Sequence, residues 1–454
     1  MKSFHKYFPA FISLTTVTLP VAGQKHTDTR PNIIFILADD MGYGDLACYG
    51  NKIIQTPNID KLAAEGIRFT QAYAGSAVSS PSRCALLTGK HTGHGTVRDN
   101  FAKKGGLTGL KNGNTIRRMH LLPEDTTIAT ILSAVGYKTC IVNKWHLDGF
   151  NPNAGPLDRG FDEFYGWLVS KDESNLPYYY PALRYYNREL IEISENRNNA
   201  GGIHNSDLSV RESIGFIERN RKNPFFLYLA FDVPHEPYFI NDLEPYGSMP
   251  LSETAKLYAS LITHTDKAIG NLIEYLEKNN LRDNTLIIFA SDNGGAAQAP
   301  LEELNCNAGL RGRKALLYEG GIKVPFIVNY PGKIKPGQIK DDLIYFPDVM
   351  PTLAAFSGAK LPHNVDGISI LPLLQGKRQN TGKRILYWEF PGQQVAIRKG
   401  KWKAVSVNKS SELELYDISK DPFEKNNLAS RYPKIVNELK REIEKSRVAS
   451  PYYE

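Results

Sequence analysis

The chain has 454 residues, of which 41% are hydrophobic and 23% are charged. These proportions are typical of a soluble globular protein, and neither a repeat nor a low-complexity tract interrupts them. The net charge of +7 favours an anionic partner, although a basic surface also serves solubility. No run of Lys and Arg with interleaved aromatic residues indicates nucleic-acid binding.

The first 23 residues have the layout of a secretory signal peptide. Lys2 and Lys6 precede an apolar stretch over residues 8–21, and Val21-Ala22-Gly23 ends it with small residues. The stretch is too short and too interrupted by proline to span a bilayer, and no later segment resembles a membrane span. We therefore expect an exported protein, free in the periplasm or outside the cell, with a net charge of +5 after the two lysines are lost (7 − 2). A frayed N-terminal arm is the alternative.

Short apolar runs alternate with helical patterns over most of the chain. An alternation of this kind predicts an α/β fold in which helices cover a mostly parallel sheet. The expected strands lie at residues 32–38, 138–142, 225–231, 285–290 and 324–328. The expected helices lie at residues 58–65, 126–135, 207–219 and 252–278.

The pattern of apolar and polar residues changes after about residue 375. Four short alternating segments predict a small antiparallel sheet, and a charged helix over residues 433–447 follows them. Gly, Lys, Arg, Gln and Asn cluster at residues 376–382, as in a linker. We predict a catalytic domain over residues 24–375 and a C-terminal subdomain over residues 376–454.

Polar residues follow directly on several of the expected strands. In an open parallel sheet the carboxyl ends of the strands share one edge, where ligands bind. Distant segments can therefore converge on one site, and these residues are Asp39, Asp40, Lys144, His146, His235, Asp292 and Asn293. The four among them that offer carboxylate or amide oxygens favour Ca²⁺ or Mg²⁺ over Zn²⁺ or copper. Capping of the helix that follows each strand is the alternative role for the acids.

The four cysteines indicate no metal site. They show neither CxxC spacing nor a neighbouring pair of histidines, and they stand at positions 48, 84, 140 and 306. Zinc and a disulfide framework are therefore not supported. The alternative is one disulfide bond between two of these cysteines, formed in an oxidising compartment. Packing in the core is the commoner role of such cysteines.

The segment Ser79-Ser80-Pro81-Ser82-Arg83 is followed by Cys84-Ala85-Leu86-Leu87-Thr88-Gly89. It resembles the signature of the type I, formylglycine-dependent sulfatases of the alkaline-phosphatase-like superfamily, in the form that begins with Ser. Other blocks in the expected order resemble those of the same family: residues 32–45, 56–63, 144–147, 234–237, 291–294 and 312–325. The resemblance thus covers nearly the whole chain after the signal peptide.

The resemblance implies a site and a mechanism. Ser79 would be oxidised to formylglycine, whose hydrate attacks sulfur and then expels sulfate as the aldehyde re-forms. Asp39, Asp40, Ser79, Asp292 and Asn293 would hold Ca²⁺, while Arg83 would steady the hydrate and the carboxylates. Lys144 and Lys314 would bind sulfate oxygens, with Arg313 beside them at the substrate. His146 would be the base for the elimination and His235 the acid for the leaving alcohol.

Two departures from the family pattern stand out. Asp148 follows the Lys144 to Leu147 block where Gly is more usual, which alters a turn but no catalytic group. The Ser start at position 79 implies maturation by a radical-type, oxygen-independent sulfatase-maturating enzyme.

The loops around the site bear on the substrate. Residues 90–94, 158–166 and 178–181 carry His, Arg, Asp and Tyr, and they resemble the galactosamine-6-sulfatase-like branch. Aromatic faces with polar neighbours suit a pyranose ring, so we expect sulfated galactose or N-acetylgalactosamine units of a glycan as substrate. The alternatives are a phosphoesterase of the same superfamily and an inert protein that binds sulfated glycans.

Overall fold

The computed structural model describes residues 30–111, 113–168, 179–199, 201–391, 394–408 and 412–453. The expected signal peptide lies outside these residues, as does Tyr178 of the aromatic loop. No helix among the described residues has the length and apolarity that a bilayer crossing demands.

The strands form one large sheet, one small sheet and a hairpin. The ten-stranded sheet has the order β12-β2-β11-β10-β1-β9-β5-β6-β7-β8. Neighbours from β10 through β6 are all parallel, whereas β11, β7 and β8 pair antiparallel with theirs. Its strands are β1 (Asn32–Ala38), β2 (Ile67–Tyr73), β5 (Lys138–Lys144), β6 (Glu163–Trp167), β7 (Leu183–Tyr186), β8 (Glu189–Glu192), β9 (Phe225–Ala230), β10 (Thr285–Ser291), β11 (Phe326–Asn329) and β12 (Gln338–Tyr345).

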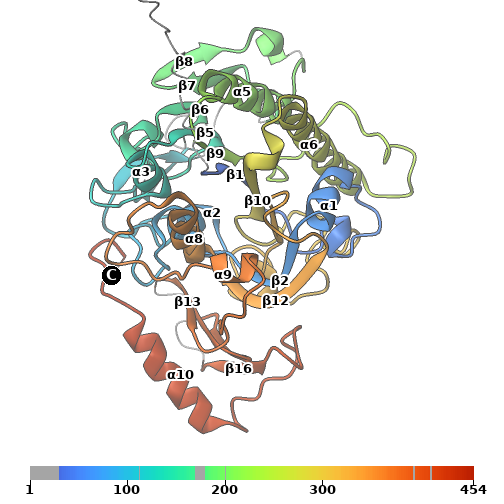
Figure 1. Ribbon diagram of the computed structural model, residues 1–454. Helices are drawn as coiled ribbons and strands as arrows, with labels where there is room; N and C mark the ends of the chain where they lie inside the picture. The colour runs from blue at the N-terminus through green and yellow to red at the C-terminus, as the bar shows by residue number, and fades with distance from the viewer. Residues whose placement is uncertain are drawn as a thin grey trace, which may run out of the picture.

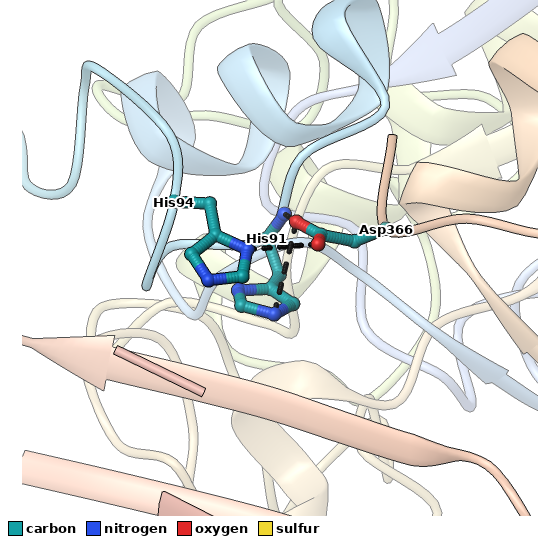
Figure 2. A group of neighbouring side chains, drawn as sticks. All are labelled: His91, His94 and Asp366. Carbon is teal, nitrogen blue, oxygen red and sulfur yellow. Dashed lines mark hydrogen bonds and ion pairs between the residues drawn. The ribbon is translucent and has the colours of Figure 1, made fainter. Parts of the chain in front are cut away.

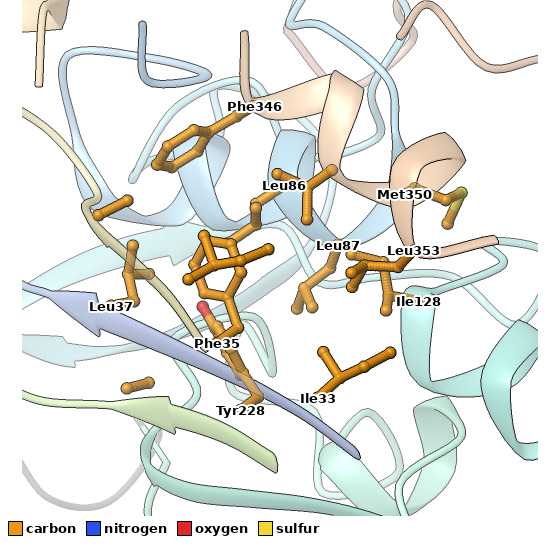
Figure 3. Packing of buried hydrophobic residues seen from close by; sticks show 14 of the residues in the cluster. Ile33, Phe35, Leu37, Leu86, Leu87, Ile128, Tyr228, Phe346, Met350 and Leu353 are labelled. Atoms are coloured by element: carbon orange, nitrogen blue, oxygen red, sulfur yellow. The ribbon is translucent and has the colours of Figure 1, made fainter. Parts of the chain in front are cut away.

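Helices cover both faces of this sheet (Figure 1). Alternate residues of β1 show the two layers, because side chains of a strand point alternately to opposite faces. Ile33 and Phe35 pack with residues of α2 (Ser79–Thr88), α3 (Ile128–Ser133) and α8 (Val349–Ser357), as Figure 3 shows.

The opposite face has its own core. Ile34 and Ile36 of β1 pack with residues of three other helices: α1 (Pro57–Ala64), α5 (Asn205–Asn220) and α6 (Glu253–Lys278). A strand buried on both faces reads as a continuous apolar run, as β1 does. Two further short helices in the predicted catalytic domain are α7 (Glu319–Ile322) and α9 (Leu371–Leu374).

The C-terminal part is an antiparallel sheet with one helix against it, at the bottom of Figure 1. Its strands are β13 (Ile385–Phe390), β14 (Gln394–Lys399), β15 (Trp402–Ser406) and β16 (Glu414–Asp417), and the helix is α10 (Pro433–Lys445). The predicted α/β class, the mostly parallel sheet and the small C-terminal sheet are confirmed. The domain boundary at 375/376 stays a prediction.

Candidate active site

The register of the parallel strands brings the predicted site residues to one edge of the sheet. Ala38, the last residue of β1, pairs with Ser291 of β10, so that Asp39 and Asp292 follow side by side. Asn143 of β5 pairs with Ala230 of β9. The chain leaves all four strands at the same edge, where Asp40 takes a left-handed backbone with a φ of 66°. A left-handed non-glycine residue is strained, and such strain gathers at functional sites.

Ser79 lies at the centre of this edge, at the start of α2. The residue is almost wholly buried. Its Oγ lies 3.0 Å from Asp39 Oδ1 and 3.2 Å from Lys144 Nζ, and it also hydrogen-bonds Asp292. The Ser79 hydroxyl thus lies between two carboxylates, which can bind a cation, and an ammonium group, which can bind an anion.

Arg83 follows one turn later on the same helix and has no exposed surface. Its Nε and Nη2 donate to Asp292 Oδ2 at 3.1 and 2.9 Å, and its Nη1 donates to the backbone carbonyl of Lys144 at 3.2 Å. A buried guanidinium with several acceptors fixes the carboxylate it contacts. Arg83 therefore ties the Ser79 helix to β10 and β5.

Lys144 and Lys314 approach the acids from two distant parts of the chain. Lys144 is buried and pairs with Asp39, whereas Lys314 is partly exposed and pairs with Asp40 at 2.6 Å. Burial lowers the pKa of Lys144. Burial acts in the same direction on Lys314, but Asp40 and Asp39 outweigh it and raise the pKa of that lysine. The site is thus open to solvent on the Lys314 side.

The acid cluster has the chemistry of a site for a hard cation. Asp39, Asp40, Asp292 and Asn293 are all buried, and Oδ1 of Asn293 has no hydrogen-bond partner. Burial and the charge of Asp39 raise the pKa of Asp292 to about 6. Burial alone would raise the pKa of Asp39 as well, but Lys144 and the other nearby cations hold it well below its usual range. Oxygen donors with an unpartnered buried amide oxygen fit Ca²⁺.

The two predicted catalytic histidines flank the cluster. His235 Nε2 lies 3.7 Å from Asp40 Oδ2, and its Nδ1 lies 2.6 Å from the carbonyl of Glu236. A carbonyl can only accept, so Nδ1 of His235 carries a proton and Nε2 faces the site. Burial and the charge of Lys314 lower the pKa of His235 to about 4.

His146 is held by a residue that the sequence patterns did not single out. Arg118 Nη1 lies 2.7 Å from His146 Nε2. Arginine has donors only, so Nε2 accepts and the neutral ring carries its proton on Nδ1, a buried atom without a partner. Burial, Lys144 and Arg118 hold the pKa of His146 well below its usual range. No motif marks Arg118; only its place beside His146 reveals it.

Arg313, predicted at the substrate, is exposed next to Lys314. The residue 90–94 loop instead makes contacts within the fold. His94 Nδ1 lies 2.8 Å from Asp366 Oδ1, and the His91 and His94 rings stack 4.4 Å apart (Figure 2). His91 Nδ1 accepts a hydrogen bond from the backbone N–H of Gly93, so its Nε2 carries the proton and cannot bind a metal in this tautomer. These side chains form a structural hydrogen-bond group.

Comparisons with known proteins agree with this geometry. Residues 31–359 match the model of the family described as Sulfatase, and residues 312–449 match "N-sulphoglucosamine sulphohydrolase, C-terminal". The chain is 34% identical to human N-acetylgalactosamine-6-sulfatase over 78% of this chain and 68% of that protein. It is 30% identical to N-acetylgalactosamine-6-O-sulfatase of Bacteroides thetaiotaomicron over 91% and 93%.

Solved structures share this fold. Ps i-CgsB in complex with k-i-k-neocarrahexaose superposes with a TM-score of 0.79 at 30% identity, covering 93% of this chain and 95% of that one. The phosphonate monoester hydrolase of Agrobacterium radiobacter shares the fold at 20% identity and a TM-score of 0.66, covering 92% and 95%. The family match over most of the chain and the relatives at this identity together place the protein in the sulfatase family, in its N-acetylgalactosamine-6-sulfatase-like branch, as a sulfuric ester hydrolase.

Proposed function

We propose that the protein hydrolyses sulfate esters of carbohydrates, with galactose or N-acetylgalactosamine sulfates of glycans as substrates, and that residue 79 acts as a formylglycine hydrate. The position of the Ser79 hydroxyl carries this proposal, because it contacts Asp39, Asp292 and Lys144 at once. A nucleophile there has a cation site on one side and a lysine for the sulfate on the other.

A serine hydroxyl alone would not suffice. Attack by serine would leave a stable sulfate ester, whereas a formylglycine hydrate supplies a second hydroxyl through which sulfate is expelled and the aldehyde returns. The conversion would be carried out by a radical-type sulfatase-maturating enzyme, since the signature begins with Ser. Burial of Ser79 requires that this enzyme act on the chain before it folds.

Asp39, Asp40, Asp292 and Asn293 would hold Ca²⁺ together with residue 79. Ca²⁺ supplies positive charge that favours ionisation of the nucleophile and polarises a sulfate oxygen. Arg83 keeps Asp292 in place through two hydrogen bonds. The positive charge of Arg83 also offsets part of the negative charge of the carboxylates around the cation site.

Lys144 and Lys314 would bind the remaining sulfate oxygens. Preorganised positive charge is most effective where water is excluded, because it needs no reorganisation during the reaction. Lys144 is buried behind Ser79, and Lys314 stands at the open side. The two ammonium groups therefore approach the sulfate position from the inner and the outer side of the site.

His235 would protonate the leaving alcohol from Nε2. The pKa of about 4 means that this histidine is neutral at pH 7 in the absence of substrate. A bound sulfate ester adds a negative charge beside it and raises that pKa, so substrate binding itself recruits the proton. Coupling of protonation to binding suits an acid that must act on a poor leaving group.

His146 would be the base that the resemblance implies, taking the proton of the second hydrate hydroxyl as the aldehyde re-forms and sulfate leaves. Burial, Lys144 and Arg118 hold the pKa of His146 well below its usual range, which favours the neutral ring that a base needs. In the structure, Arg118 Nη1 donates to the lone pair on Nε2. Transfer of the proton to Nε2 would therefore require the Arg118 contact to open.

The substrate class rests on the relatives. Two of them are named N-acetylgalactosamine-6-sulfatases, and two solved neighbours contain a neocarrahexaose and D-glucosamine-2-N,6-O-disulfate. We also propose export to the periplasm or beyond, on the basis of the first 23 residues. A screen of the mature enzyme against monosaccharides that differ only in sugar and sulfate position tests the substrate.

The nucleophile is tested by mass spectrometry and by substitution. Peptides containing residue 79, from protein made in a host with a radical maturating enzyme, should show the loss of two hydrogens from serine. Ser79→Ala should abolish turnover and spare binding of the sulfated sugar. Unmodified serine in protein that still binds glycan would favour a binding protein instead. Faster hydrolysis of a matched phosphate ester than of the sulfate ester would favour a phosphoesterase.

A further inference from the structure

A strongly basic hairpin stands beside the site, and apart from Arg118 at its end it has no role in the chemistry described so far. It comprises β3 (Leu107–Lys111) and β4 (Asn114–Arg118), paired antiparallel, together with residues 100–106 that lead into it. Residues 100–118, hereafter the basic hairpin, contain five cationic residues and no acid: Lys103, Lys104, Lys111, Arg117 and Arg118. A single-sign segment of this kind creates a local positive potential.

Two contacts fix the base of the basic hairpin to the reacting groups. Arg118 Nη1 lies 2.7 Å from His146 Nε2. The side chain of Asn100 accepts a hydrogen bond of 2.9 Å from the backbone N–H of Ser80, the residue after the nucleophile. The first residue of the basic hairpin therefore contacts Ser80, the neighbour of Ser79, and its last residue contacts His146.

The hairpin also carries exposed apolar side chains next to its cations. Leu107 pairs with Arg118 across the two strands, and side chains of directly opposite residues lie on the same face. Leu107 and Phe101 are each 43% exposed, and Leu110 is 68% exposed. Arg118 lies 5.4 Å from the centre of the Phe101 ring. Apolar and aromatic faces beside cations suit sugar rings that carry anionic groups.

Three of the cations are available to a ligand. Lys103, Lys104 and Arg117 are exposed. No carboxylate in the part of the chain that the structure describes forms an ion pair with them. Asp99 lies four residues before Lys103, and burial outweighs the effect of Lys103 and raises the pKa of Asp99 to about 6, so this carboxyl is ionised at pH 7 and offsets part of the charge of Lys103. Within the described residues, Lys104 and Arg117 therefore have no carboxylate in ion-pair contact, and the hairpin itself keeps its net positive charge.

We propose that the basic hairpin binds the sugar units that flank the cleaved residue in an oligosaccharide with several sulfate or carboxylate groups. This proposal rests on the proposed function and extends it, since it makes a multiply anionic chain, and not an isolated sulfated sugar, the preferred substrate. The occupant follows from charge complementarity. A sulfate in the site beside Ser79 places the neighbouring anionic units of the same chain within reach of Lys103, Lys104 and Arg117.

The test compares two substrates and two charge variants. The triple variant Lys103→Gln, Lys104→Gln, Arg117→Gln should lose roughly tenfold in kcat/KM on a sulfated galactan oligosaccharide, because three exposed ionic contacts are removed at once. The loss should appear in KM and shrink in high salt. Turnover of N-acetylgalactosamine 6-sulfate should stay within about twofold, because the monosaccharide does not reach the hairpin.

A matched control removes three exposed cations elsewhere: Lys420→Gln, Lys434→Gln, Lys440→Gln, in the C-terminal part. It has the same net charge as the hairpin variant, and it should behave as the unmutated enzyme with both substrates. Equal losses on both substrates, or equal losses in both variants, would overturn the proposal.

A binding experiment separates this proposal from the proposed function. In a Ser79→Ala background, calorimetry with the same oligosaccharide should show weaker binding once the three hairpin cations are removed. Unchanged binding overturns the hairpin proposal even if the enzyme hydrolyses sulfate esters. Absence of turnover on every sulfate ester by formylglycine-containing protein, with hairpin-dependent binding intact, rejects the proposed function alone. Thermal unfolding of each variant checks that the fold is retained.

Discussion

Asn293 shows how one side chain sets the chemistry of the acid cluster. Its Nδ2 donates to Asp40 Oδ1 at 2.7 Å, which leaves its Oδ1 buried and without a partner. An unpaired buried acceptor costs free energy unless a cation or donor meets it. A neutral amide among carboxylates also limits the negative charge around Ser79.

We predict that Asn293→Leu, which keeps the size of the side chain, weakens Ca²⁺ binding by roughly ten- to a hundredfold. The measurement is the rise of the thermal midpoint of chelator-treated protein as Ca²⁺ is added, because a ligand that binds only the folded state stabilises it. The midpoint of the variant should respond at correspondingly higher Ca²⁺. The same change at Asn223, an exposed turn residue, is the control, and an unchanged response in Asn293→Leu would remove this residue from the ligand set.

Between elements, the contact of α6 with the start of α1 depends on Asp266. Its carboxylate accepts hydrogen bonds from the backbone N–H groups of Asn58 and Ile59, the first turn of α1. These donors favour the ionised form, but burial outweighs them and raises the pKa of Asp266 above its ordinary value of 3.8, to about 6. The two helices are thus joined through a carboxyl group whose ionised form is destabilised by burial.

The sign of the resulting pH dependence follows from linkage. A carboxyl whose pKa is raised in the folded state contributes stability below its unfolded pKa, and this contribution is lost as the pH rises through the folded value. We predict that ionisation of Asp266 removes about 3 kcal/mol between pH 4 and 6, from a shift of roughly two units. Urea unfolding of the wild type and of Asp266→Asn at several pH values measures this; a constant difference between the two proteins would contradict it.

The elements themselves were largely predictable from periodicity. The long helix expected at residues 252–278 is α6 (Glu253–Lys278), and the expected strand at 32–38 is β1. The strand expected at 324–328 is β11 (Phe326–Asn329), but it runs antiparallel to β10. Direction depends on which neighbour a strand pairs with, and a run of apolar residues carries no information on that. Strands β2, β6, β7, β8 and β12 were not predicted, because they are short or partly exposed.

At the scale of the whole molecule, a buried ionic network joins the C-terminal sheet to the catalytic part. Lys403 of β15 pairs with Glu319 of α7 at 3.0 Å and with Glu424 at 2.8 Å, and none of these side chains is exposed. Burial raises the pKa of Glu424 to about 7, whereas Lys403 and other cations overcome burial at Glu319 and lower its pKa to about 2. One lysine thus balances two buried acids.

We predict that Lys403→Met destabilises the protein by about 3 to 5 kcal/mol at neutral pH, because it leaves buried carboxylates unpaired. The loss should be smaller at pH 5, where Glu424 takes up a proton. Denaturant unfolding measures both values. Lys401→Met, on the neighbouring pair in which half-exposed Lys401 contacts Asp417, should cost at most about 1 kcal/mol. Equal effects of the two substitutions would show that the buried network does not hold the two parts together.

The sequence by itself determined the kind of chemistry. The residue types after the apolar runs, the Ser79 to Gly89 segment and the order of the blocks are local, so they can be read without coordinates. Only the tertiary structure decided which atoms meet. Arg118, the last residue of the basic hairpin, reaches His146 across 28 residues of chain, and this contact fixes the proton of the neutral His146 ring on Nδ1. Such contacts depend on strand register and loop path, which are set by packing of the whole molecule and leave no trace in residue spacing.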